Sequence, residues 1–127
     1  MKIKLLDYKV VALNMSATGD IASPDGSMSL EVGQVYPDDE SGIFGIGFKV
    51  DLKQDNLSVE AEMRFFFQAD GEITDEFRRG PFPAINAPAI AFPYLRSFLS
   101  TVTLQAGYEP VMLPSVNFVE FARRAAK

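Results

Sequence analysis

Histidine, cysteine and tryptophan are all absent from the 127 residues of this sequence. Histidine is the commonest general base and a common metal ligand, and cysteine supplies the thiol nucleophile and thiolate metal ligands. Only carboxylates and hydroxyls remain for chemistry. Without cysteine there is also no disulfide framework, which agrees with a reducing compartment. We therefore expect a binding protein rather than an enzyme, with no cofactor and no bound metal.

Long hydrophobic runs and basic clusters are also scarce. No apolar segment approaches the roughly 20 residues that a membrane-spanning helix needs, so no membrane insertion is expected. Residues 1–19 carry acidic and polar side chains where a signal peptide needs an unbroken apolar region, and we expect a cytoplasmic protein. The net charge of −5 argues against a nucleic-acid partner, because phosphate binding depends on clustered lysine and arginine. The small basic groups Arg78-Arg79 and Arg123-Arg124 suit a loop and a helix end.

The length and composition describe one globular unit. A chain of 127 residues can bury a single core, and we expect one domain over residues 1–127. Hydrophobic residues make up 47% of the sequence and charged residues 23%, which is typical of a folded domain. The chain is therefore expected to fold unaided.

Alternation of apolar and polar residues with a period of two predicts four strands in the first half of the chain. The expected strands cover residues 3–15, 27–36, 44–53 and 57–67. In the first of them the apolar residues change from one face to the other, which indicates a β-bulge or burial on both faces. The short turns predict an antiparallel meander with one apolar face that the helices must cover.

Glycine and proline mark the breaks in this pattern. Gly42, Gly45 and Gly47 fall within a strand pattern, where a missing side chain lets another backbone or an aromatic ring approach closely. Residues 70–87 contain several glycines and prolines, and they predict an irregular loop.

Two helices are expected after this loop. Pro88 or Pro93 suits the first turn of a long helix, and Gly107 is placed to end it. Asn117 followed by Glu120 forms the pattern of a capping box, which predicts a second, short helix.

The long helix is apolar on two neighbouring stripes, and its polar positions are mostly serine and threonine. One sheet can cover only one stripe of a helix, so the other stripe needs a different partner. The sequence therefore predicts an oligomer in which this helix contributes to the interface. The residues of the two stripes are Phe92, Leu95, Leu99 and Val102, together with Tyr94 and Phe98.

Two segments carry a resemblance to a known family. The segment FPYLRSFL, at residues 92–99, and the segment LPSVNFVEF, at residues 113–121, are similar to the C-terminal signature of the SecB family of protein-export chaperones. Phe92, Pro93, Tyr94 and Arg96 match the first motif, and Val116, Asn117 and Phe118 match the second. The resemblance implies an α+β fold with a four-stranded antiparallel sheet followed by a long and a short helix.

The same resemblance implies a function. Members of the family form a homodimer or a dimer of dimers with the long helices between the sheets. They hold unfolded polypeptides in hydrophobic grooves without ATP and pass them to an export motor ATPase. This sequence ends soon after the second helix begins, before the extended tail that contacts the motor in family members. Shorter SecB-like proteins serve one dedicated partner, such as an antitoxin, and this is the alternative function.

The aromatic content supports binding of unfolded chains, since 11 phenylalanines and 4 tyrosines can line an adaptable apolar surface. Phe66 is the sharpest candidate, because it points to the polar face of its strand. The alternative for Phe66 is burial under a loop or a second subunit, and for the others it is ordinary core packing. The candidate peptide-binding residues are Tyr36, Phe44, Phe66, Met112, Phe118 and Phe121.

The carboxylates allow two further interpretations. The resemblance makes the outward strand residues Glu31, Asp51, Glu60 and Glu62 a candidate surface for docking the motor, and an ordinary solubilising surface is the alternative. The turn residues 38–40 could bind a hard cation such as calcium or magnesium, but they lack the ligand spacing of a known cation-binding loop, so a solvated turn is the favoured interpretation. An enzyme that uses carboxylates is a distant third function.

Overall fold

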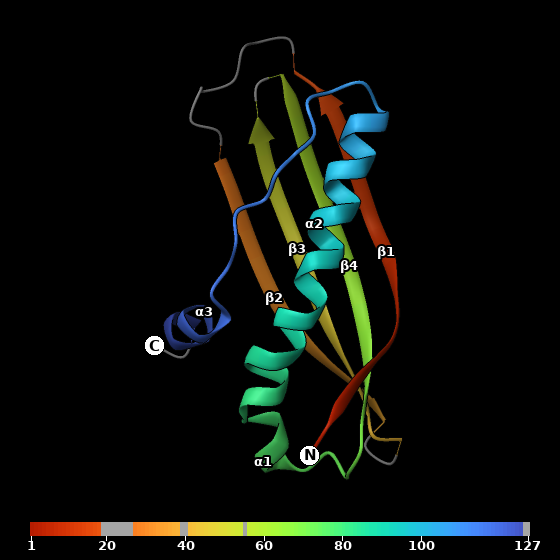
Figure 1. Ribbon diagram of the computed structural model, residues 1–127, viewed down its shortest axis with the longest axis vertical. Helices are drawn as coiled ribbons and strands as arrows, with labels where there is room; N and C mark the ends of the chain where they lie inside the picture. The colour runs from red at the N-terminus through yellow and green to blue at the C-terminus, as the bar shows by residue number, and fades with distance from the viewer. Residues whose placement is uncertain (19–26, 39–40, 55, 126–127) are drawn as a thin grey trace.

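The computed structural model describes residues 1–18, 27–38, 41–54 and 56–125. It contains one four-stranded antiparallel sheet in the spatial order β1-β4-β3-β2 (Figure 1). The strands are β1 (Ile3–Ala17), β2 (Ser27–Asp38), β3 (Ile43–Gln54) and β4 (Leu57–Ala69). All four expected strands are present, and each ends within a few residues of its predicted boundary.

The expected meander is wrong in one respect, because β1 pairs with β4 and not with β2. The pairing runs from Ile3 opposite Ala69 to Ala17 opposite Leu57. Alternation along a strand indicates which face is buried but carries no information about its neighbour. The connection of residues 18–26 is also longer than a hairpin turn, so β2 need not lie beside β1.

The predicted bulge in β1 is confirmed. The register with β4 shifts between Leu5 and Asp7 and again between Val10 and Ala12. Each shift adds one residue to β1, so apolar residues on either side of a bulge, such as Leu5, Tyr8 and Leu13, stay on the same face of the sheet although the sequence pattern changes phase.

The helical half begins earlier than expected. Residues 70–87 are not wholly irregular, since they contain the short helix α1 (Asp75–Arg78) and the π-helical turn η1 (Phe82–Asn86). Thr74 starts α1 by accepting a hydrogen bond from the Phe77 N–H at 3.1 Å. The sequence prediction gave the glycines and prolines of this segment too much weight, because α1 fits between Gly71 and Gly80, and η1 accommodates Pro83 at its start.

The two expected helices are α2 (Ala87–Gln105) and α3 (Phe118–Ala125). Pro88 lies in the first turn of α2, as predicted, whereas Pro93 lies within the helix. Gly107 follows the end of α2 with a φ of 98°, a left-handed conformation that glycine adopts without strain.

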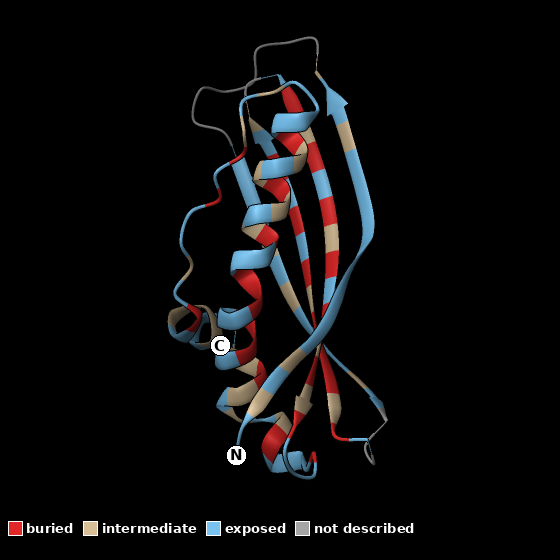
Figure 2. Cartoon of the chain, turned by 45° about the vertical axis from the view of Figure 1, so that its right-hand side comes forward, coloured by how far each residue is buried: buried red, intermediate tan, exposed pale blue. Residues whose placement is uncertain are grey.

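The hydrophobic core lies between α2 and one face of the sheet, which we call the inner face. Buried residues alternate along β3 and β4 and follow one side of α2, whereas β1 and β2 are largely exposed (Figure 2). The largest fully buried side chains include Phe44, Phe48, Phe65 and Phe67 from the central strands and Leu95 and Leu99 from α2. The opposite face of the sheet, the outer face, is covered by no helix in the part of the chain that the structure describes.

Gly45 on β3 allows an aromatic ring to lie across the outer face, as the strand pattern predicted. Gly45 is directly opposite Phe66 of β4. A Cβ atom on Gly45 would lie 3.1 Å from Phe66 Cε1 and 3.4 Å from Val35 Cβ, which is closer than side chains normally pack. The ring of Phe66 therefore occupies the space that a side chain at position 45 would fill.

This packing predicts opposite effects for alanine at two outer-face glycines. Gly45→Ala is expected to destabilise the protein because Phe66 must move, whereas Gly33→Ala meets no atom within 4 Å. Gly33→Ala is expected to raise the free energy of unfolding by about 0.5–1 kcal/mol, since alanine loses less conformational freedom than glycine on folding. Urea denaturation of the two variants checks the prediction, and equal effects would contradict the packing described for Phe66.

Candidate functional site

The segment between α2 and α3, residues 106–117, crosses the inner face beside α2 and is called the strap here (Figure 1). Two side chains of α2 hold it. Thr103, which is fully buried, accepts a hydrogen bond from the Val111 N–H at 2.9 Å and donates one to the Leu99 carbonyl at 2.7 Å. Arg96 Nε donates to the Leu113 carbonyl at 3.1 Å. These hydrogen bonds hold the strap in place over the inner face of the sheet.

Removing the Thr103 hydroxyl is expected to loosen the strap. Thr103→Val keeps the shape of the side chain but leaves the buried Val111 N–H without its acceptor, which costs about 1–3 kcal/mol of unfolding free energy. Thr101→Val is the matched control, since Thr101 lies exposed on the same helix and the change should be nearly neutral. Urea denaturation measures both, and an unaffected Thr103→Val variant would show that the hydroxyl does not anchor the strap.

Asn117 starts α3 as predicted. Its side-chain Oδ1 accepts hydrogen bonds from the N–H groups of Val119 at 3.0 Å and Glu120 at 3.2 Å. The carboxylate of Glu120 forms an ion pair with Arg123 at 3.2 Å, within the same helix. This cap fixes the direction in which the short helix leaves the strap.

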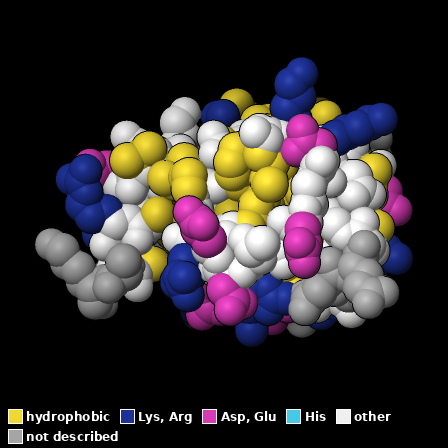
Figure 3. All heavy atoms as spheres, turned by 90° about the horizontal axis from the view of Figure 1, so that it is seen from below, with side chains coloured by type: hydrophobic (Ala, Val, Ile, Leu, Met, Phe, Trp, Pro, Cys, Tyr) yellow, Lys and Arg dark blue, Asp and Glu magenta, His cyan; other side chains and the backbone are white. Residues whose placement is uncertain are grey.

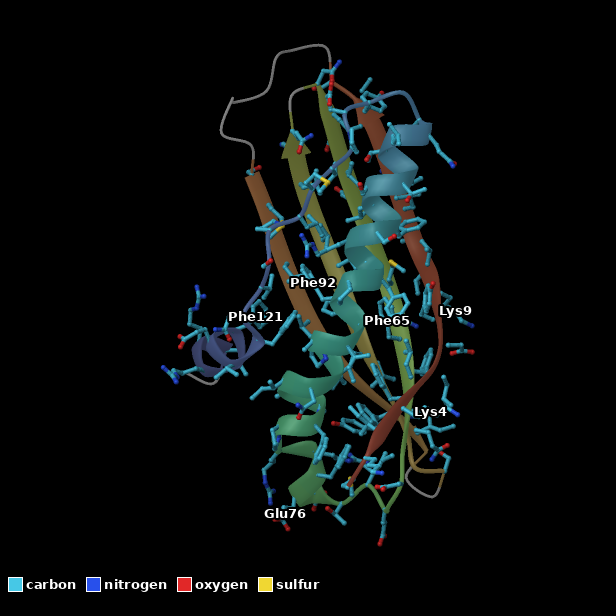
Figure 4. All side chains as sticks on the ribbon, viewed as in Figure 1. Lys4, Lys9, Phe65, Glu76, Phe92 and Phe121 are labelled. Carbon is cyan, nitrogen blue, oxygen red and sulfur yellow. The ribbon has the colours of Figure 1, made fainter. Side chains whose placement is uncertain are left out.

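Aromatic contacts join α3 to the rest of the protein. The ring centroid of Phe118 lies 5.5 Å from that of Phe92 on α2 and 6.2 Å from that of Phe48 on β3. Phe121 packs against Phe118 with a centroid distance of 5.9 Å and remains partly exposed. Figure 4 places Phe121 on the side of α3 that faces the sheet. The helix thus presents Phe121 beside the strap while Phe118 holds it in place.

A second group of aromatic side chains lies near the end of the sheet where α1 is found. Tyr36 at the end of β2 is partly buried, with the Arg78 guanidinium 4.4 Å from its ring centroid and its hydroxyl donating to Gln34 Oε1 at 2.6 Å. Burial raises the pKa of the Tyr36 hydroxyl, and the Arg78 charge partly offsets this, so the hydroxyl stays protonated and donates. Phe44 stacks behind Tyr36 at 6.4 Å.

The same end of the molecule has an apolar surface. Figure 3 shows hydrophobic side chains gathered in the middle of this end, with charged side chains around them. An apolar surface ringed by charge is typical of a contact site for another polypeptide.

The six candidate peptide-binding residues do not share one surface. Met112, on the strap, is 72% exposed, and Tyr36 and Phe121 are partly exposed. Phe44 and Phe118 belong to the core, since Phe44 has no exposed surface and Phe118 only 5%. Phe66 lies apart on the outer face, over Gly45. Tyr36, Met112 and Phe121 are therefore the accessible members, with Phe44 behind Tyr36 and Phe118 behind Phe121.

An apolar surface that the sequence did not predict lies where β1 meets α2. The inner-face residues Tyr8, Val10 and Leu13 of β1 are 40–46% exposed, and Tyr94 of α2 is 43% exposed. The rings of Tyr8 and Tyr94 are in contact, with centroids 5.2 Å apart. We call this the β1–α2 surface, and its members are Tyr8, Val10, Leu13, Ile90, Tyr94 and Leu104. The sequence pattern did not reveal this surface, because the bulges in β1 interrupt the alternation with a period of two.

The helix residues proposed for the oligomer interface divide into two groups. Phe92, Leu95 and Leu99 are at most 4% exposed because they pack on this chain's own sheet, which corrects their assignment to an intermolecular contact. Phe98 and Val102 are partly buried, and Tyr94 is on the β1–α2 surface. The helix is therefore apolar on two sides, as predicted, but the free side is centred on Tyr94.

The four candidate docking carboxylates do lie on one face, the outer face. They alternate with cations across the strands, since Lys49 is directly opposite both Glu31 and Glu62. Arg64 also forms an ion pair with Glu62 at 3.5 Å. Among these four carboxylates, Asp51 and Glu60 face each other as like charges. The face is thus of mixed charge, which sequence alternation alone could not reveal because it ignores cross-strand neighbours.

Neither metal ligation nor a membrane span finds support in the described residues. In residues 1–18, 27–38, 41–54 and 56–125, no group of three or more acidic side chains is arranged to hold a metal ion. Asp39 and Glu40 of the candidate cation turn lie outside the described residues. Within the described part of the chain, no helix is both long and apolar enough to cross a membrane.

Comparison with known proteins decides the family. A sequence model of the family described as preprotein translocase subunit SecB matches residues 22–127. This chain belongs to the SecB family. Members of this family are chaperones and not enzymes.

The similar curated proteins include named SecB proteins. A protein-export protein SecB of Cereibacter sphaeroides is 35% identical over 89 residues, which cover 61% of this chain and 52% of that protein. An uncharacterized protein of Methanocaldococcus jannaschii is 38% identical over 71 residues, which cover 56% of this chain and 44% of that protein. The chain thus spans about half the length of these curated relatives.

A solved structure has the same SecB fold. It is a SecB-like chaperone of Mycobacterium tuberculosis, in complex with a peptide from the HigA1 antitoxin. The TM-score is 0.70 at 14% identity, and the match covers 91% of each chain. The strand order, the long α2 and the short α3 are therefore those of a SecB-like fold.

Proposed function

We propose that this SecB-family protein is an ATP-independent holding chaperone that binds unfolded or partly folded polypeptides. The observation that carries the proposal is a set of accessible apolar side chains, Met112 on the strap, Phe121 on α3 and Tyr36 at the end of β2, of which Tyr36 and Phe121 pack on buried rings. We call these three residues the strap-side surface. Apolar segments that an unfolded chain exposes lose contact with water when they cover this surface.

The side chains of the strap-side surface suit clients of varied sequence. Met112 is flexible and polarisable, so it can adapt to different client side chains. The rings of Tyr36 and Phe121 provide large apolar area with few rotatable bonds. Binding through such apolar side chains is non-covalent, so we expect it to be reversible and to need no nucleotide.

We further propose that the β1–α2 surface joins copies of this chain into a homodimer or a dimer of dimers. Tyr8, Val10 and Leu13 lie on the edge strand of the sheet, beside the exposed Ile90 and Tyr94 of α2. An exposed apolar edge strand would otherwise promote aggregation, and pairing with a second copy covers it. The strap and α3 lie on the side of α2 away from β1 (Figure 1), so Met112 and Phe121 would stay free in such an assembly.

A dedicated polypeptide partner is the second candidate function. It is favoured by the likeness to the mycobacterial SecB-like chaperone, whose structure contains an antitoxin peptide. Export is a third role of the same surface, in which the client passes to a motor ATPase that docks on the outer-face carboxylates. All three roles rest on binding a polypeptide in the cytoplasm and differ in its identity.

Light scattering distinguishes these roles. Several unrelated proteins are unfolded chemically and diluted with equimolar chaperone, and aggregation is followed with time. A general holding chaperone suppresses aggregation of most of them, whereas a dedicated one suppresses aggregation of its partner alone. Failure to slow aggregation of any client, together with no stoichiometric partner in a pull-down from the native host, would contradict the proposal.

A further inference from the structure

The outer face of the sheet contains a hollow that neither the strap-side surface nor the β1–α2 surface uses. It lies over two neighbouring glycines, Gly33 of β2 and Gly47 of β3, which are directly opposite each other. Its volume is about 280 Å³. Val35 lies at one end, the pair Glu31 and Lys49 at the other, and Arg64 closes the side toward β4.

The covered glycine next to this hollow shows what kind of group fits there. Gly45 lies two residues before Gly47, and the ring of the directly opposite Phe66 fills the space above it. No atom lies within 4 Å of the position that a Cβ on Gly33 would occupy, and at Gly47 only Arg64 Cγ comes as close as 4.0 Å. The Gly33–Gly47 pair therefore has the same flat backbone floor as Gly45, without the ring.

The strand that carries Gly33 is accessible from its side. β2 is an edge strand of the sheet, and in the described part of the chain its backbone ladder is formed with β3 alone. Its second edge therefore has N–H and C=O groups that an extended peptide can pair with. A strand added at this edge would place every second side chain over the outer face.

We propose that an extended segment of a partner polypeptide pairs with the free edge of β2 and lays an aromatic side chain over Gly33 and Gly47. The aromatic residue stands opposite Gly33, as Phe66 stands opposite Gly45, and covers the glycine floor in the same way. Val35, which is 39% exposed, packs against the edge of the ring. The cations of Lys49 and Arg64 flank the hollow and favour an aromatic ring over an aliphatic side chain.

This inference rests on the proposed function, since it takes polypeptide binding as given and adds a second contact on the opposite face. It names a recognition element, one aromatic residue in an extended segment. The strap-side surface accepts apolar side chains of any shape, whereas the hollow holds one ring in one register. A polypeptide that engages both surfaces would bind more tightly than one that engages either alone.

The experiment uses the 127-residue chain labelled with ¹⁵N and two synthetic peptides. One peptide alternates threonine and lysine around a single central tyrosine, and the other has alanine at the centre. The tyrosine peptide is expected to shift the amide signals of Gly33 and Gly47, and the alanine peptide to do so at least tenfold more weakly. Shifts confined to the region of Tyr36 and Phe121, with Gly33 and Gly47 unmoved, would overturn the inference while leaving the proposed function intact.

Filling the hollow provides the matched test. Gly33→Val places a side chain in open space and suits a strand, so the variant is expected to fold and to bind the tyrosine peptide at least tenfold more weakly. Ser29→Val makes a similar change on the same face of β2, outside the hollow, and is expected to keep the affinity within twofold. Equal affinities of wild type and Gly33→Val would also overturn the inference. If neither peptide nor any unfolded client binds at either surface, the proposed function fails as well.

Discussion

Replacing Phe48 by alanine is expected to lower the free energy of unfolding by about 3–5 kcal/mol, the cost of removing a buried phenylalanine ring. Phe48 is fully buried at the point where the sheet, α2 and α3 meet. Its ring centroid lies 5.7 Å from that of Phe65, 5.8 Å from that of Phe92 and 6.2 Å from that of Phe118. No single neighbour can fill the cavity without losing its own contacts, so little relaxation is expected.

Urea denaturation at one fixed protein concentration measures this change, because assembly makes stability depend on concentration. Lys53→Ala is the control, since Lys53 lies on the same strand as Phe48 but is exposed on the outer face opposite two serines, and its loss should cost less than about 0.5 kcal/mol. A cost below about 1 kcal/mol for Phe48→Ala would contradict the view that Phe48 joins the three elements, because even modest core truncations exceed it.

The second large effect concerns assembly. Leu13→Asp is expected to weaken association of the subunits by about 100-fold or more, because the new carboxylate would be buried without a partner at the β1–α2 surface. Leu13 is 40% exposed in the single chain, so the isolated subunit should tolerate the change. Sedimentation at micromolar concentration should therefore detect a fall from the oligomer mass to the monomer mass.

Asn14→Asp tests whether added charge alone explains that result. Asn14 is the next residue of β1 and lies opposite Glu60 on the outer face, so the variant gains the same charge away from the proposed interface. It should sediment as wild type does. If the wild-type chain itself is a monomer at micromolar concentration, or if Leu13→Asp assembles normally, the proposed role of the β1–α2 surface is wrong.

Local features of the fold were predictable from the residues that determine them. Asn117 accepts the backbone hydrogen bonds that start α3, and Gly107 adopts the left-handed conformation after α2. The alternation in residues 57–67 identified the buried face of β4. In each case neighbours within a few positions of the sequence decide the structure.

Long-range features were not predictable in the same way. Nothing in the alternation of residues 3–15 indicates that β1 pairs with β4, because the pairing depends on how the whole sheet packs under α2. The bulges of β1 also scattered Tyr8, Val10 and Leu13 in the sequence pattern, although they gather on one surface. The helix stripes suggested an interface, but only the sheet decides which stripe stays free.

The candidate binding residues were likewise predictable by residue type but not by their environment in the fold. The residue type identified aromatic side chains suited to binding, yet Phe44 and Phe66 differ in environment, because Phe44 packs on Phe77 of α1 and Phe66 lies on the outer face. An alternation with a period of two identifies the inner and outer faces of a strand. It does not indicate which apolar residues of the inner face remain exposed beside the strap. The position of the strap depends on the hydrogen bonds that Thr103 and Arg96 form with it. These bonds join residues that no strand or helix period relates.

The most direct test of the central claim is the affinity of the chain for an unfolded polypeptide. A permanently unfolded, fluorescently labelled client is titrated with wild type and with Phe121→Ser, and the anisotropy of the label is measured. We predict saturable binding by wild type without ATP and at least tenfold weaker binding by Phe121→Ser. Val119→Ser, which trims an exposed apolar residue of the same helix, should change the affinity less than twofold. Absence of binding by wild type, or equal affinities of wild type and Phe121→Ser, would contradict the account.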